Sequence, residues 1–346
     1  MLNGTEMMEI NKIYNENCLS LASRMPDNFI DCVITSPPYY GLRDYGTDGQ
    51  FGLEETPEMF VENLVNLFRE VRRAMKDTGT LWLNLGDSYA GSQTNNGGCS
   101  EKSTLSGGGG KYRTGSKNEK AYNNNNTKKI KHGIKPKDLI GIPWMVAFAL
   151  RADGWYLRQD IIWHKPNPMP ESVTDRCTKA HEYIFLLSKS QKYFYDADAI
   201  KEDSIHYGTD NRSDKGNIIY EGKRTENTDG SNGQDSFVTI NEKRNKRSVW
   251  SVTTKPFKEA HFATFPEDLI EPCVLAGCPK GGLIYDPFGG AGTTAKVAVK
   301  HGRNYILSEI NPDYIDIAEK RIRDFVILEG TPDPDKAIKG QQINLF

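Results

Sequence analysis

The sequence predicts an α/β protein with a doubly wound, mostly parallel β-sheet. Short segments that are apolar almost throughout alternate along the chain with segments of helical periodicity, which is typical of a sheet covered by helices on both faces. A glycine-rich segment at 286–294 follows one such strand and precedes a helix. Of the 346 residues, 37% are hydrophobic, which favours a large folded core and excludes a chain that is disordered throughout.

Six strands are expected where β-branched, leucine and aromatic residues gather. They span 30–35, 80–85, 157–163, 183–187, 283–286 and 305–309. The clearest helix is predicted over 57–76, because Thr56 can cap it, Pro57 suits its first position and Gly79 follows its end. Two further helices are expected over 266–276 and from residue 312 onward.

Two polar stretches without helix or strand periodicity interrupt this pattern. Residues 88–135 carry nine basic and two acidic residues, hence a local charge of +7, while 200–248 carry nine of each kind. Loops of this length inside a compact domain are commonly functional. The predicted organisation is one domain over 10–328 with insertions at 88–135 and 200–248, followed by a C-terminal tail at 329–346.

Composition excludes several classes of protein. No apolar run approaches the ~18–20 residues of a membrane span, and the N-terminus lacks the pattern of a secretory signal. Six cysteines in a chain of this length do not form a disulfide framework, so a cytoplasmic location is expected. The cysteines and histidines lack the spacing of a metal site, so no metal is predicted. The net charge of −2 still allows DNA binding through a local basic patch.

A nucleoside-containing cofactor is predicted at the glycine-rich turn. Glycines let the backbone bend sharply and approach a ligand, and the helix N-terminus behind them favours negative charge. Glu309 ends the next strand about 20 residues later, the spacing at which an acidic residue binds ribose hydroxyls. This pattern does not separate NAD from S-adenosylmethionine. The candidate cofactor residues here are Asp286, Pro287, Phe288, Gly289, Gly290, Gly292, Thr293 and Glu309.

A second candidate site follows the strand at 30–35. Pro37 and Pro38 lack backbone N–H groups and stiffen the chain, so this segment offers carbonyl oxygens as acceptors. A planar base with an amino group could stack on Tyr39 and donate to the Ser36 hydroxyl and the Pro37 carbonyl. Such hydrogen bonds would prepare the amine lone pair to attack a methyl donor without a covalent intermediate. The candidate catalytic residues are Ser36, Pro37, Pro38 and Tyr39.

These two motifs, in this order, resemble those of the β group of DNA amino-methyltransferases. Residues 35–39 are similar to the catalytic motif of that family, and 286–293 to its cofactor motif. Other segments that resemble family motifs are 162–167, 181–185, 262–266 and 311–314. The resemblance covers most of the chain. It implies a circularly permuted Rossmann-like methyltransferase fold, S-adenosylmethionine as cofactor, and a flipped base held by the Ser-Pro-Pro-Tyr segment.

The resemblance adds cofactor candidates and bears on the target base. Phe265 lies just ahead of the helix at 266–276, and Asn17 stands where the family commonly has an aspartate near the adenine. Asp87, after the strand at 80–85, is a secondary candidate for either pocket. Serine at position 36 is commoner in N4-cytosine enzymes, and aspartate there in N6-adenine enzymes. The implied activity is site-specific methylation of the cytosine N4 amine in duplex DNA, with N6-adenine as the alternative.

Duplex DNA is the implied substrate, and basic residues of the two insertions are its candidate contacts. They are Lys111, Arg113, Lys128, Lys129, Lys243, Arg244, Lys246 and Arg247. The family relationship also implies a cognate restriction endonuclease as partner, and Gln342–Phe346 resembles peptides that dock on bacterial sliding clamps. Two alternatives from other classes stay open: a dinucleotide-dependent oxidoreductase built on the same glycine turn, and a DNA-binding protein without activity.

Overall fold

The computed structural model describes residues 8–42, 47, 49–90, 134–204, 243–254 and 265–328. The chain divides into two compact units, the first formed by Met1–Asp196 with Ser248–Phe346 and the second by Ala197–Arg247. Within the described ranges, no helix is long and apolar enough to span a membrane. The first unit contains the main sheet and both candidate sites.

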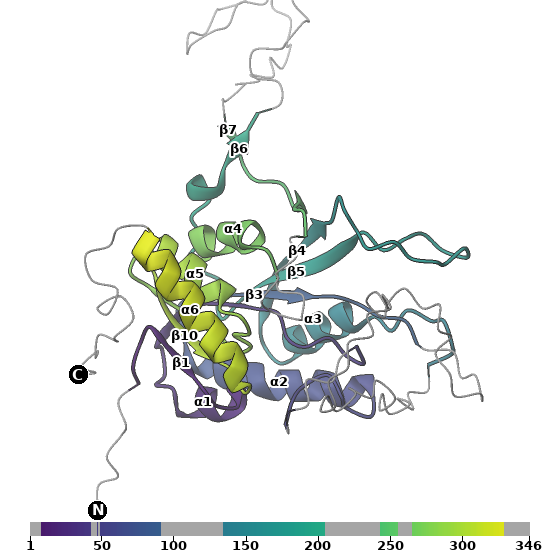
Figure 1. Ribbon diagram of the computed structural model, residues 1–346, viewed down its shortest axis with the longest axis horizontal. Helices are drawn as coiled ribbons and strands as arrows, with labels where there is room; N and C mark the ends of the chain where they lie inside the picture. Colours follow the sequence, from purple (N-terminus) through teal and green to yellow (C-terminus); the bar gives the residue numbers. More distant parts are fainter. Residues whose placement is uncertain are drawn as a thin grey trace, which may run out of the picture. The chain divides into compact units, whose positions relative to one another are not determined.

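The first unit is built on an eight-stranded sheet with the order β1-β10-β9-β2-β3-β5-β4-β8 (Figure 1). Every neighbouring pair is parallel except β3 with β5 and β5 with β4. The sequence prediction of a doubly wound, mostly parallel sheet is therefore confirmed. The strands are β1 Lys12–Tyr14, β2 Ile30–Thr35, β3 Met75–Leu85, β4 Tyr156–His164, β5 His181–Ser188, β8 Val249–Ser251, β9 Leu283–Asp286 and β10 Asn304–Ser308.

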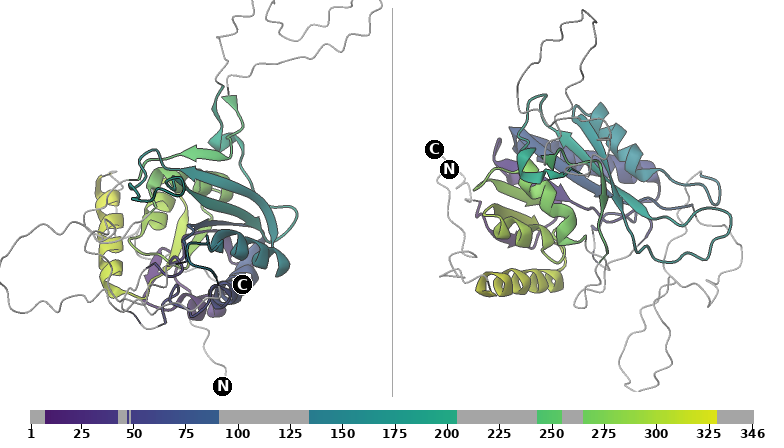
Figure 2. Two further views of the ribbon diagram at one scale, coloured as in Figure 1. Left: turned by 90° about the vertical axis from the view of Figure 1, so that its right-hand side faces the viewer. Right: turned by 90° about the horizontal axis from the view of Figure 1, so that it is seen from above.

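Helices cover both faces of this sheet (Figures 1 and 2). One layer consists of α1 (Cys18–Arg24), α2 (Pro57–Ala74) and α3 (Ile142–Ala152), and the other of α4 (Glu267–Gly277), α5 (Thr293–Lys300) and α6 (Pro312–Leu328). Helix α2 begins as predicted, with the Thr56 side chain accepting a hydrogen bond from the Met59 N–H. It ends two residues earlier than predicted, because Met75 is already extended and pairs with Ile30 as the first residue of β3.

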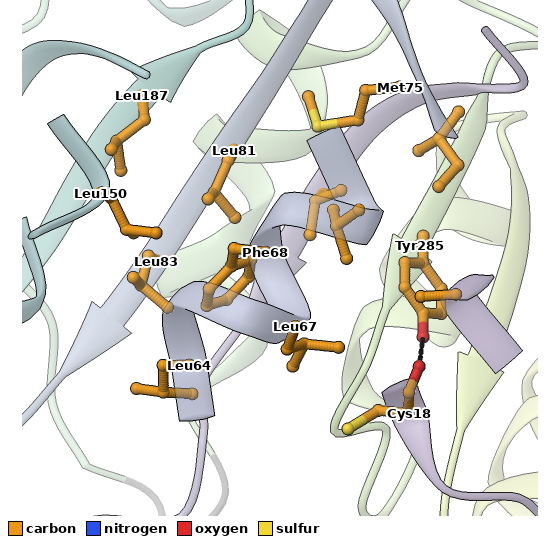
Figure 3. Close-up of a cluster of buried hydrophobic side chains, with 14 of the residues drawn as sticks. Cys18, Leu64, Leu67, Phe68, Met75, Leu81, Leu83, Leu150, Leu187 and Tyr285 are labelled. Atoms are coloured by element: carbon orange, nitrogen blue, oxygen red, sulfur yellow. Dashed lines mark hydrogen bonds between the residues drawn. The ribbon is translucent and has the colours of Figure 1, made fainter. Parts of the chain in front are cut away.

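The main core lies between the sheet and the layer α1–α3 (Figure 3). Leu64, Leu67 and Phe68 of α2 are fully buried there together with Leu81 and Leu83 of β3. Each such side chain contributes on the order of 1.5–3 kcal/mol when it leaves water. This packing fixes β2 and β3, and therefore the segments that leave their carboxyl ends.

The carboxyl ends of β1, β10, β9, β2 and β3 all lie at one edge of the sheet. Strands β2 and β9 are neighbours, with Val33 opposite Tyr285, although about 250 residues separate them in the chain. From this pair the chain winds outward in opposite directions, which makes it the topological switch point where α/β proteins bind ligands. The Ser-Pro-Pro-Tyr segment leaves β2 here, and the glycine-rich turn leaves β9.

The second unit is described at 197–204 and 243–247. A short 3₁₀ helix (Asp198–Ile200) precedes β6 (Glu202–Asp203), which pairs antiparallel with β7 (Lys243–Arg244). The Glu202 carboxylate accepts hydrogen bonds from Arg244 Nε at 2.9 Å and Arg247 Nε at 2.6 Å. This unit coincides almost completely with the polar stretch at 200–248.

Candidate active site

Asp286 connects the two candidate motifs across the switch point. Thr35 Oγ1 donates to its Oδ1 at 2.6 Å, and Thr294 Oγ1 donates to its Oδ2 at 2.6 Å. The Phe288 N–H also donates to Oδ1, at 3.0 Å. Burial raises the pKa of Asp286 to about 6, although these three hydrogen bonds oppose the rise. With its carboxylate 1% exposed and bound on both oxygens, Asp286 organises the turn rather than reaching toward a ligand.

The turn after Asp286 has room for glycine alone at two positions. A Cβ at Gly289 would lie 2.8 Å from Leu307 Cβ, and one at Gly292 would lie 2.7 Å from Ala318 Cβ. Gly292 also has φ of 74° and immediately precedes α5, so the backbone is left-handed where the helix begins. The turn therefore packs closely on β10 and α6 and presents its backbone at the switch point.

Glu309 lies beside this turn at the end of β10. Its Oε2 accepts from the Gly290 N–H at 2.8 Å and its Oε1 from the Asn311 N–H at 2.8 Å. Partial burial raises the pKa of Glu309, against the lowering effect of these backbone hydrogen bonds. The structure therefore places Glu309 beside the glycine turn, as the sequence predicts. The binding of ribose hydroxyls by this carboxylate stays a prediction.

The remaining cofactor candidates surround the turn. Asn17 Oδ1 caps α1 by accepting from the Leu19 N–H at 2.9 Å, while the side-chain amide nitrogen makes no hydrogen bond to the described residues. The Phe288 ring meets the Phe51 ring edge to face, with centroids 5.3 Å apart. Phe265 is half-buried just ahead of α4. Phe51 was not identified from the sequence.

The Ser-Pro-Pro-Tyr segment presents a fixed aromatic ring. The Tyr39 hydroxyl lies 2.6 Å from Glu182 Oε2 and 3.3 Å from Asn84 Oδ1. The ring packs against Gly86, where a Cβ would come within 2.4 Å of Tyr39 Cε2. The half-buried Ser36 hydroxyl makes no hydrogen bond within the part of the chain that the structure describes. It is therefore available to a ligand.

Sequence reasoning missed two residues that bind the Tyr39 hydroxyl, Glu182 and Asn84, and a third, Lys165, that binds Glu182. Glu182 and Asn84 are 9% and 4% exposed, and Asn84 Nδ2 also donates to the Tyr183 carbonyl at 3.0 Å. Lys165 Nζ donates to Glu182 Oε1, so the carboxylate has a cationic partner. Lys165 and Glu182 lie in the segments 162–167 and 181–185, whose resemblance to family motifs is the sequence signal that could have identified them, whereas Asn84 lies in neither segment.

Asp87 has a structural role at the start of α3. Its carboxylate accepts from the backbone N–H groups of Ser88 at 2.9 Å, Gly141 at 2.9 Å and Ile142 at 3.2 Å. Negative charge at a helix N-terminus is stabilising, and here it satisfies donors that have no partner inside the helix. These hydrogen bonds give Asp87 a structural role near the start of α3, and its role in the cofactor or base pocket stays a prediction.

The predicted DNA contacts are described in part. Lys111, Arg113, Lys128 and Lys129 lie outside the described residues, as does the segment Gln342–Phe346. The other four, Lys243, Arg244, Lys246 and Arg247, lie in the second unit, where Glu202 pairs with the two arginines. Their contact with DNA stays a prediction.

The fold and the site define a class of protein. A sheet with the Ser-Pro-Pro-Tyr segment and a glycine turn at one switch point is the arrangement expected of a Rossmann-like methyltransferase. The family model described as DNA methylase, of the N6 and N4 type, matches residues 30–320. The chain therefore belongs to the DNA methylase family, which decides against the dinucleotide-dependent oxidoreductase.

Similar proteins extend over nearly the whole chain. Type II methyltransferase M.Cfr9I of Citrobacter freundii is 42% identical over 93% of this chain and 91% of its own length. Type II methyltransferase M.SmaI of Serratia marcescens is 43% identical over 86% of each chain. The fold resembles the solved structure of the cytosine-N4-specific PvuII DNA methyltransferase, with a TM-score of 0.58, 16% identity and coverage of 96% and 92%. It also resembles a putative DNA modification methylase from Thermus thermophilus complexed with S-adenosyl-L-methionine, with a TM-score of 0.54, 19% identity and coverage of 91% and 94%.

The cofactor of this methyltransferase family is S-adenosylmethionine, and the residues present fit it. The glycine turn leaves open space at Gly290, where a Cβ would meet only the Phe288 carbonyl oxygen at 3.9 Å. The Glu309 carboxylate lies beside that space and could accept hydrogen bonds from hydroxyl groups. The Phe288 ring could stack on a flat group. These features agree with a nucleoside held at the carboxyl end of β9.

Proposed function

We propose that this protein is the modification methyltransferase of a type II restriction-modification system and methylates the N4 amine of cytosine within one duplex sequence. The full-length similarity to type II methyltransferases supports the biological role. Serine at position 36, where N6-adenine enzymes more often have aspartate, supports cytosine as the target. N6-adenine is the alternative target.

The observation that carries the proposal is the link from Thr35 to Asp286. This 2.6 Å hydrogen bond joins the residue that precedes the base-holding segment to the residue that begins the cofactor turn. Both side chains are buried, at 1% exposure each. A base that leaves the duplex and enters beside Ser36 would therefore meet a methyl donor bound over Gly290. Orientation of two reactants in this way supplies a large part of a transfer enzyme's rate enhancement.

Separate groups of residues are proposed to bind the base and the cofactor. In the proposal, the flipped base stacks on Tyr39, and its amine donates hydrogen bonds to Ser36 Oγ and the Pro37 carbonyl. Both acceptors are neutral, and they orient the amine lone pair through hydrogen bonds, without a covalent bond to the base. When bound, S-adenosylmethionine supplies an electrophilic methyl group. Glu309, Phe288, Gly290 and Asn17 hold the cofactor, while Asp286, Pro287, Gly289, Gly292 and Thr293 shape its site, and Phe265 borders it.

The polar stretches and the chain end complete the proposed organisation. A catalytic domain over 10–328 carries the insertion 88–135, which grips phosphates, and the insertion 200–248, which reads the sequence. A cognate endonuclease in the cytoplasm would cleave the unmodified site. The tail 329–346 would dock on a sliding clamp through Gln342–Phe346. A pull-down with purified clamp that is unaffected by removal of the last five residues would refute that contact.

The test is to express the protein in a host without DNA methyltransferases of its own. Nucleoside mass spectrometry of the genomic DNA identifies the modified base, and single-molecule sequencing locates it. We expect N4-methylcytosine at one recognition sequence, and its absence in cells that express Tyr39→Ala. N6-methyladenine instead would overturn the choice of target. No modified base, from a protein that still binds DNA, would favour the inactive DNA-binding alternative.

A further inference from the structure

Met169 has the highest exposure, at 69%, among the large hydrophobic side chains that the structure describes as exposed. It lies in the connection 165–180 between β4 and β5, which extends beyond the carboxyl edge of the sheet (Figure 1). The base of this loop is closed by the Lys165 N–H, which donates to the Ala180 carbonyl at 2.8 Å. Lys165 also binds Glu182, which holds Tyr39. The loop thus starts at the proposed base pocket.

The loop is stiff on both sides of Met169. Pro166, Pro168 and Pro170 fix three φ angles within five residues. Asn167 makes a reciprocal pair of hydrogen bonds with the backbone of Thr254, at 3.1 Å to its carbonyl and 3.0 Å from its N–H. An exposed apolar side chain on a rigid support is arranged for contact with a partner, because little conformational entropy is lost on binding.

The part of the loop that returns to β5 is also held by side-chain contacts. Arg176 Nη1 donates to Glu171 Oε2 at 2.5 Å, and the Arg176 guanidinium lies over the Tyr89 ring at 4.0 Å from its centroid. Tyr89 follows β3 closely, and both Asn84 at the end of this strand and Gly86 just after it lie beside Tyr39. Both arms of the loop therefore have a fixed relation to the strands that form the base pocket.

We propose that Met169 inserts into the base stack of the DNA duplex and fills the space left by the flipped target base. The inference rests on the proposed function, since only an enzyme that flips a base creates this space. The vacated position is bounded by the flat apolar faces of neighbouring bases. Apolar side chains, methionine among them, insert between base steps of DNA as wedges. The vacated position therefore suits Met169, the more exposed of the two exposed large apolar side chains on this loop (Val173 is 38% exposed), better than a basic or polar side chain.

Matched and mispaired duplexes separate this role from general DNA binding. A wedge stabilises the flipped state, and flipping is less costly for a mispaired base. We expect Met169→Ala to lower kcat/KM about tenfold on a matched duplex that contains the recognition sequence, and about twofold or less when the target base is mispaired. The control is Ile327→Ala, which removes an exposed apolar side chain (57%) from the last turn of α6, away from the carboxyl edge. It should match the wild type on both duplexes.

Each alternative result has a distinct meaning. If the wild type methylates both duplexes and Met169→Ala matches it on both, or loses the same factor on both, the wedge is refuted and the proposed function stands. The second of these patterns would be the result if Met169 only docked a protein partner or stabilised the loop. If the wild type methylates neither duplex, the proposed function and the wedge are both overturned.

Discussion

Replacing Tyr39 with alanine removes two features at once, the ring proposed to stack on the target base and the hydroxyl bound to Glu182. Stacking of one base on an aromatic side chain contributes about 1–3 kcal/mol, which corresponds to about 5- to 160-fold in kcat/KM. Tyr39→Phe keeps the ring and removes only the hydroxyl, with its hydrogen bonds to Glu182 Oε2 at 2.6 Å and to Asn84 Oδ1 at 3.3 Å. Since Gly86 still supports the ring, we expect Tyr39→Phe to lose about tenfold or less.

The Glu182 carboxylate should act on activity through Tyr39. Glu182→Gln keeps the shape of the side chain but weakens its bonds to Lys165 and to the Tyr39 hydroxyl. In a Tyr39→Phe background the second bond is already absent, so the double variant should lose less than the product of the two single losses. A fully multiplicative double variant would show that Glu182 works independently of Tyr39.

The assay is transfer of a tritiated methyl group to a duplex with the recognition sequence. Isothermal titration with S-adenosylmethionine serves as control. All Tyr39 variants should bind the cofactor within about twofold of the wild type, because the two hydrogen-bond partners described for the hydroxyl, Glu182 and Asn84, are not cofactor candidates. Thermal unfolding checks that the variants are folded. Wild-type kcat/KM in Tyr39→Ala would remove Tyr39 from the base pocket and refute the stacking argument.

Three further predictions concern the surroundings of the site. Gly86→Ala places a methyl group 2.4 Å from Tyr39 Cε2, so the ring must move; we expect at least about a tenfold loss of methyl transfer with cofactor affinity retained, and an unchanged rate would contradict this. Glu309→Ala leaves the Gly290 and Asn311 N–H groups without their acceptor, so the Kd for S-adenosylmethionine measured by calorimetry should rise about tenfold or more, and a change under about twofold would exclude its ribose role. The folded protein binds a proton at Asp286 more tightly than the unfolded chain, since burial raises this pKa from 3.8 to about 6, so its contribution lowers stability as pH rises through that window. Asp286→Asn removes this loss. In urea unfolding, the free energy of unfolding of the variant should therefore rise relative to that of the wild type by up to about 3 kcal/mol between pH 4 and pH 8, and a relative fall over this range would refute the raised pKa.

Local patterns were sufficient for much of the fold. Apolar runs bounded by Gly, Pro and polar residues located six strands of the main sheet to within a few residues, with β3 as the main exception because it starts five residues early. Helix α3 was missed, since its sequence is apolar on nearly every side and carries no amphipathic stripe to reveal its period. Strands β1 and β8 have three residues each, too few to show an alternation.

In the candidate site, too, local sequence predicted some features and only the tertiary structure decided others. Composition and order alone identified the Ser-Pro-Pro-Tyr segment and the glycine turn with its acid, because proline and glycine restrict or free the backbone wherever they stand. Only the tertiary structure decided which side chains face them. Tyr39 meets Glu182 across 143 positions of sequence, and Thr35 meets Asp286 across 251, because β2 lies between β3 and β9 in the sheet. The sequence thus determined which chemical groups are available, whereas strand order and register determined that Asp286 is enclosed and Tyr39 is held.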